Sequence, residues 1–166
     1  MNCARRSASC AAALLSRSRV LFAKLKPLDG LFVGWAFFLQ TVLVVHFALR
    51  KPFFENYTLK YGWLVYALCI PGLVISVILL IGKMPWYFWL GGILFTAFAI
   101  FGYYIDYVKS ISWRSPIIAH IMAPYVTLYL ASIMFYWWPL ARIDRRLWFI
   151  FSILFVIGTV LNITSH

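Results

Sequence analysis

The chain has 166 residues, of which 64% are hydrophobic and only 11% are charged. Soluble domains carry about 25% charged residues, and a soluble fold of this length could not bury so much apolar surface. The formal net charge of +11 raises the question of nucleic-acid binding, but the basic residues lie at the edges of apolar runs and do not follow one exposed face. The composition therefore predicts an all-α integral membrane protein and argues against a nucleic-acid partner.

Residues 1–28 form a basic N-terminal tail that contains six basic residues and no acidic one. Leu14, Leu21 and Leu25 share one face of a helical wheel, which indicates a partly amphipathic helix on the membrane surface. A disordered basic tail is one alternative. A cleaved targeting segment is another, because Arg- and Ser-rich composition without acids is typical of organelle transit peptides.

Five apolar segments follow within a transmembrane domain of residues 29–166. Four of them are long enough to cross about 30 Å of hydrocarbon as a helix, and the last is shorter. Pro71 interrupts the second segment, and the missing N–H of a proline predicts a kink there. Residues 139–146 are expected to form a basic loop. The approximate segments are 31–49, 61–81, 86–105, 116–138 and 147–161.

Lys and Arg are distributed unequally over the two sides of this five-helix topology. The side that carries residues 1–30, 82–85 and 139–146 holds ten of them, and the other side holds five. The positive-inside rule therefore places the N-terminus inside and the C-terminus outside. The bacterial inner membrane and the mitochondrial inner membrane suit this orientation equally well.

Small residues recur at helical spacing in the third and fourth segments. Such stripes let helices approach closely in lipid, so we expect these two segments to pack against each other. Gln40, a polar residue in the middle of the first segment, is expected to hydrogen-bond to a neighbouring helix. The predicted packing residues are Gly92, Thr96, Ala99 and Gly102 in the third segment and Ala119, Ala123, Thr127 and Ala131 in the fourth.

His46, His120 and Asp106 are the candidate functional residues, because an ionisable residue within a membrane segment is a functional hypothesis by default. The topology puts all three near the outer ends of their segments. We favour histidines that bridge helices or lie at the membrane interface. A haem held by both histidines, a metal site formed by all three residues, and general acid–base catalysis are alternatives. No cofactor is predicted.

The sequence contains no P-loop, GxSxG, HExxH or dinucleotide-binding motif. Together with the scarcity of charge inside the segments, this favours a non-catalytic subunit, assembly factor or scaffold of a membrane complex. Its expected partners are membrane lipids and either other subunits or further copies of the chain. The alternatives are a small membrane-embedded enzyme acting on a lipid or isoprenoid-like substrate at the outer half of the bilayer, and a small-solute transporter.

Overall fold

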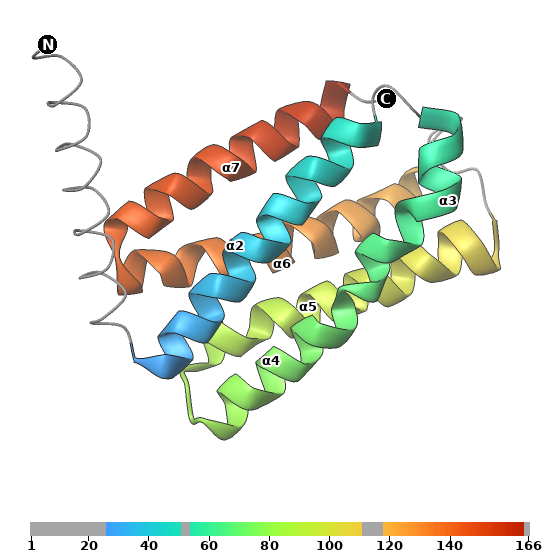
Figure 1. The fold of residues 1–166 in the computed structure, drawn as a ribbon. Coiled ribbons are helices and arrows are strands. Elements are labelled where there is room, and N and C mark those ends of the chain that lie inside the picture. Colours follow the sequence, from blue (N-terminus) through green and yellow to red (C-terminus); the bar gives the residue numbers. More distant parts are fainter. Residues whose placement is uncertain (1–25, 51–53, 111–117, 165–166) are drawn as a thin grey trace, which may run out of the picture.

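The computed structural model describes residues 26–50, 54–110 and 118–164, and every regular element in these ranges is helical. The helices run alongside one another in one bundle (Figure 1). The predicted all-α class is therefore confirmed, whereas residues 1–25 of the predicted tail lie outside the described residues. The elements are α2 (Pro27–Arg50), α3 (Phe54–Ala67), α4 (Cys69–Ile81), α5 (Trp86–Tyr103), the π-helical turn η1 (Tyr104–Val108), α6 (Ala119–Ile143) and α7 (Arg145–Thr164).

Five helical stretches of the described chain are long and apolar enough to cross a membrane. Each predicted segment overlaps one of them, so the predicted number is confirmed. The last stretch has 20 residues, about 30 Å as a helix, because it begins before and ends after the predicted segment. The stretches are Pro27–Arg50, Lys60–Ile81, Trp86–Val108, Ala119–Ile143 and Arg145–Thr164.

The second stretch is broken at Leu68, between α3 and α4. Pro71 has no backbone N–H and cannot donate to the carbonyl of Ala67, so the regular helix is interrupted one turn before the proline. The N–H of Gly72 donates to the Leu68 carbonyl at 3.1 Å and resumes the helical pattern. The kink predicted from Pro71 corresponds to this break.

The expected loop of residues 139–146 is instead a one-residue turn at Asp144. Pro139 is buried within α6, and the helix continues through it to Ile143. Asp144 has an extended backbone, and its Oδ1 accepts a hydrogen bond from the N–H of Arg146 at 2.6 Å. This side-chain cap starts α7 immediately after α6 ends.

One large apolar core, rich in aromatic rings, runs through the bundle. Helix α5 packs between α4 and α6, and α7 packs against α6 and α2. Phe32 is fully buried and meets Phe88 edge to face, with ring centroids 4.9 Å apart. Phe95 and Phe151 are likewise fully buried. These contacts connect the first, third and last membrane-length helices into one unit.

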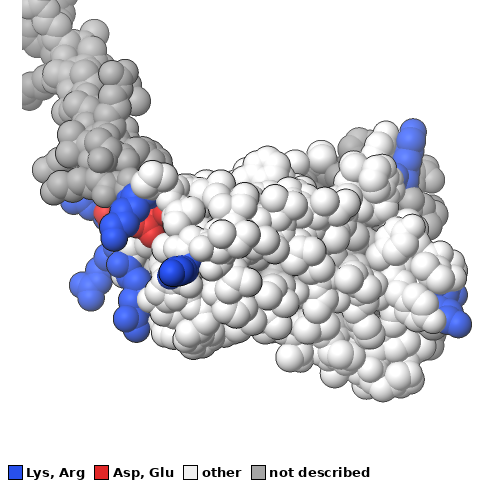
Figure 2. All heavy atoms as spheres, turned by 90° about the horizontal axis from the view of Figure 1, so that it is seen from below, with Lys and Arg blue, Asp and Glu red and all other residues white. Residues whose placement is uncertain are grey.

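On the face shown in Figure 2, the charged side chains of the described residues gather towards the two ends of the bundle, and the surface between them is uncharged. Large hydrophobic side chains of the bundle are strongly exposed, among them Ile70, Phe149 and Ile163. Such a surface is unfavourable in water and suits the hydrocarbon of a bilayer. Most of the described basic residues lie at the end where α2 starts and the α4–α5 and α6–α7 turns meet: Lys26, Lys83, Arg142, Arg145 and Arg146.

Candidate functional site

A hydrogen-bonded cluster of tyrosines and a carboxylate joins three elements near the opposite end. The hydroxyl of Tyr66 in α3 donates to Asp106 Oδ2 at 2.6 Å and lies 3.3 Å from the hydroxyl of Tyr125 in α6. The rings of Tyr103 and Tyr107 lie 6.5 and 6.2 Å from that of Tyr66. These five residues are called the tyrosine–aspartate cluster below.

Two backbone features position the carboxylate of this cluster. Helix α5 widens at its end into η1, and Asp106 lies in that π-helical turn. Just before the turn, a Cβ atom at Gly102 would lie 2.6 Å from Tyr66 Cε1 and 3.0 Å from Tyr125 Cε2. The glycine therefore lets both rings reach the level of the carboxylate. Because π-helical turns are frequent at functional sites, the cluster is the leading candidate site.

The cluster has two chemical capacities. As a structural element, it ties α3 to η1 and α6, and a 2.6 Å O–H···O contact has the length of a hydrogen bond to a charged acceptor. As a reactive element, the Asp106 carboxylate can accept a proton from a polar group that reaches it, while the Tyr66 hydroxyl holds it in place by a hydrogen bond.

The two candidate histidines have different surroundings. His46 is half-buried on α2, where it lines a hollow with residues of α3, and its ring lies 5.6 Å from that of Phe47. His120 is exposed at the start of α6. Over the described residues, no group of three or more His, Cys, Asp or Glu side chains is close enough to hold a metal ion. The hydrogen bond shown for Asp106 goes to Tyr66, not to a histidine.

The small-residue stripe of the third segment lies mostly in the interior. Gly92, Ala99 and Gly102 are buried, and Thr96 is half-buried with its hydroxyl donating to the Gly92 carbonyl at 2.8 Å. A Cβ at Gly92 would overlap Ser76 Oγ and would lie 2.7 Å from the carbonyl oxygen of Gly72 in α4. This stripe therefore serves the contacts of α5 with α3 and α4 and, at Gly102, also the contact with Tyr125 of α6.

The small-residue stripe of the fourth segment lies elsewhere. The close contact of α5 with α6 forms at Gly91, where a Cβ would lie 3.3 Å from the backbone of Phe135. Helices α5 and α6 thus pack against each other, as expected for the third and fourth segments. Most of the second stripe nevertheless lies on the outer surface of the described bundle, away from this contact. Ala119, Ala123 and Thr127 are exposed, and Ala131 is half-buried.

Polar side chains within the membrane-length helices bond to neighbouring helices. Trp35 Nε1 donates to the hydroxyl of Tyr136 at 3.1 Å, which joins α2 to α6. Gln40 Nε2 donates to the carbonyl of Leu154 at 3.3 Å, which joins α2 to α7 as expected for Gln40. Trp137 Nε1 donates to Ser152 Oγ at 2.7 Å, between α6 and α7. These bonds fix helix positions inside the bundle.

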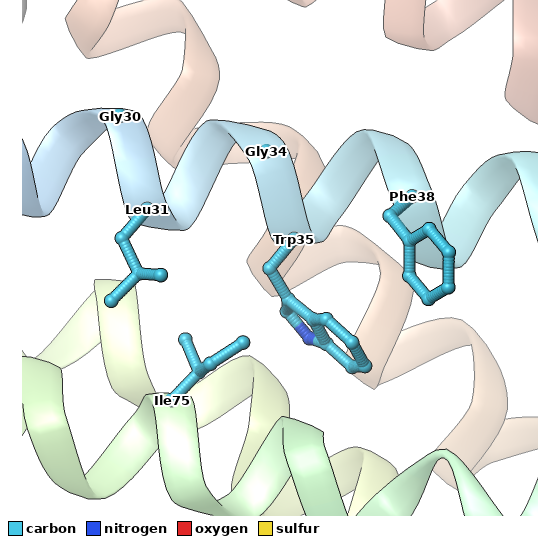
Figure 3. Close-up of a pocket in the computed structure, with 6 residues that line it drawn as sticks. All are labelled: Gly30, Leu31, Gly34, Trp35, Phe38 and Ile75. Carbon is cyan, nitrogen blue, oxygen red and sulfur yellow. The ribbon is translucent and has the colours of Figure 1, made fainter.

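Two apolar hollows follow α2 on the side that faces α3 and α4. The first has a volume of about 290 Å³, and Figure 3 shows Leu31 and Trp35 of α2 pointing towards Ile75 of α4 across it. The second, of about 380 Å³, lies between α2 and α3 and includes His46. Phe38 borders both hollows. The two hollows together are called the α2 groove.

Sequence analysis did not single out Tyr66, which is central to the tyrosine–aspartate cluster. The position of Tyr66 along its segment could have indicated this role. Tyr66 lies about one and a half turns inside the second segment, and Asp106 ends the third segment at the same end of the bundle. The π-helical turn and the α2 groove had no signal of this kind, since both depend on how separate helices meet.

Comparisons with models of known protein families, with curated proteins and with solved structures each find no match to this chain. The class that the structure supports is a helical bundle with five membrane-length helices over the described residues.

Proposed function

We propose that the chain is a multi-pass integral membrane protein that acts as a non-catalytic component of a membrane complex, as a subunit, assembly factor or scaffold. The observation that carries this proposal is that polar side chains of the helices bond to other helices of the same chain. The side chains of Trp35, Gln40 and Trp137 each bond to another helix of the same chain. These groups hold the bundle together, and its outer sides are left apolar for lipid or for other membrane helices.

The distribution of charge supports an orientation for this component. The start of α2 and the α4–α5 and α6–α7 turns carry five of the eight basic residues whose side chains are described. By the positive-inside rule, this end faces the cytoplasm or the mitochondrial matrix, and the tyrosine–aspartate cluster lies towards the outer side.

Helix α6 offers the surface best suited to a partner helix. Its exposed small residues, Ala119, Ala123 and Thr127, allow close backbone approach, which drives helix association in membranes where lipid and apolar side chains are equally hydrophobic. The side chains of α4 that face outward are larger, with Val77 as an example. We therefore expect the partner to contact α6 and not α4.

The test is the size and composition of the complex that the chain forms in mild detergent. Ala123→Phe is expected to reduce the stoichiometric partner or the self-associated form, and Val77→Phe, at an exposed position on α4, is the matched control. His46→Ala and His120→Ala are expected to leave the complex intact. A chain that is purely monomeric in its native membrane, by chemical cross-linking, would contradict the proposal.

The alternative of a small membrane enzyme is favoured by one observation, the 2.6 Å contact of Tyr66 with Asp106 in a π-helical turn. Asp106 would act as the general acid or base on a lipid-like substrate. Asp106→Asn, at unchanged protein level, would then cause one lipid species of the host membrane to accumulate in mass spectra of lipid extracts. An unchanged lipid profile would remove this alternative.

A further inference from the structure

We propose that the α2 groove binds one acyl chain of an anionic glycerophospholipid, whose phosphate is held by Lys26 and Lys83. The inference is independent of the role proposed above, because it concerns a lipid site on a different side of the bundle from the exposed stripe of α6.

The first hollow of the groove has room because two glycines of α2 border it. A Cβ atom at Gly30 or Gly34 would meet no heavy atom within 4 Å, so the chain leaves open space beside this part of α2. The surrounding side chains are Leu31, Trp35 and Ile75 (Figure 3). An apolar hollow of about 290 Å³ that opens to the side of a membrane protein suits a flexible hydrocarbon chain.

The groove is long enough to cover the depth of one leaflet. From Gly30 to Phe38 the helix rises about 12 Å, and from Phe38 to His46 it rises about 12 Å more. One leaflet of hydrocarbon is about 15 Å deep, half of the bilayer core. An acyl chain that enters beside Gly30 therefore fills the first hollow and reaches the start of the second, past Phe38.

The end of the groove beside Gly30 lies at the basic end of the bundle. Lys26 immediately precedes α2 and is exposed. A Cβ at Gly82 would lie 2.6 Å from Leu28 Cδ1, so the turn that contains the exposed Lys83 lies against the first turn of α2. Both lysines are thus within about one helical turn of the entrance to the groove.

Acidic residues also lie at this end, but the net charge of its described residues is positive. The described charges there are five basic and two acidic, which leaves a net charge of +3, complementary to a lipid phosphate. Arg142 is directed towards aromatic rings, with its guanidinium 5.8 Å from the Tyr87 ring and 5.7 Å from the Trp138 ring. Arg145 and Arg146 lie in the first turn of α7, a helix that lines neither hollow. Lys26 and Lys83 are therefore the described cations of this end that lie beside the helices of the groove. The two acidic residues are Asp29 and Asp144.

The test is native mass spectrometry of the full chain in detergent with added palmitoyl-oleoyl phosphatidylglycerol or phosphatidylcholine. We expect one phosphatidylglycerol molecule to be retained more strongly than phosphatidylcholine. Lys26→Gln and Lys83→Gln should each lower this preference about fivefold, the effect of one basic residue near an anionic surface. Lys109→Gln, at the opposite end, is the matched control and should leave the preference unchanged.

The groove itself is tested by filling it. Gly34→Leu should abolish retention of both lipids. Gly30→Leu places a side chain in the same hollow and should have the same effect. Far-UV circular dichroism of each variant checks that the bundle is intact. Val77→Leu, on the outer side of α4, is the control that keeps binding. Unchanged retention in both glycine variants would overturn the proposal. The proposal would also be overturned if the wild-type chain were a dimer and both variants converted it to a monomer without loss of lipid. The occupant of the α2 groove would then be a second copy of the chain.

Discussion

The tight contact of Gly92 in α5 with α4 offers a sharp test of the packing of this bundle. In Gly92→Ala, the added methyl group would overlap Ser76 Oγ and would lie 2.7 Å from the carbonyl oxygen of Gly72. Favourable contacts between heavy atoms lie at about 3.5–4.0 Å, and a backbone carbonyl cannot rotate away as a side chain can. Helices α4 and α5 must therefore move apart along their shared surface.

The expected magnitude combines two opposing effects. Overpacking of this kind costs about 1–3 kcal/mol, whereas replacing glycine by alanine within a helix contributes up to about 1 kcal/mol of stability. The net expectation for Gly92→Ala is a loss of about 1–2 kcal/mol in the free energy of unfolding, a five- to thirtyfold change in the folding equilibrium.

The assay is unfolding by SDS in mixed micelles, followed by far-UV circular dichroism. Gly34→Ala in α2 is the matched control, because a Cβ at that position meets no heavy atom within 4 Å, and it should be neutral or stabilising. Adding Ser76→Gly to Gly92→Ala should recover part of the loss, since the clash with Gly72 persists. Equal stabilities of Gly92→Ala and Gly34→Ala would refute the reasoning.

Three further predictions concern polar groups and orientation. Tyr66→Phe and Asp106→Asn should each lower stability by about 1–2 kcal/mol, and the double variant should lose less than the sum because both remove the same hydrogen bond; additive losses would contradict the bond. Gln40→Leu should change stability by less than about 1 kcal/mol, because Gln40 Oε1 is buried without a hydrogen-bond partner among the described residues; a loss above about 2 kcal/mol would show that both amide atoms are bonded. A His166→Cys variant without the native cysteines should react with an impermeant maleimide only from the outer side; reaction from the inner side alone would reverse the orientation.

The membrane-length helices were predictable because the apolar runs that form them are local in sequence. Hydropathy requires no knowledge of neighbouring helices, and the break before Pro71 follows from the missing N–H of that residue alone. The one-residue turn at Asp144 was also local, since a capping residue before a new helix has a recognisable pattern. Pro139 and three arginines nearby favour a loop on composition alone, and they outweigh this single capping residue.

The packing of the stripes shows what local patterns leave undetermined. Spacing identified Gly92 and Gly102 as residues that permit close approach, but a stripe of small residues does not specify which helix approaches. Gly92 meets α4 and Gly102 meets α3 and α6, whereas Ala123 faces outward. The candidate site depended on the same missing information, because Tyr66 and Asp106 are separated by 40 residues.

The hydrogen bond between Gln40 and Leu154 has a consequence for how the protein is made. It spans 114 residues of chain, and it joins the first membrane-length helix to the last one. During synthesis, α4, α5 and α6 can pack in succession as each emerges, since each contacts the one before it. The Gln40 amide of α2 must therefore wait for its final acceptor until α7 has been synthesised. The bundle is therefore closed when its last helix meets its first, and a chain that stops before α7 would leave the Gln40 amide without this acceptor.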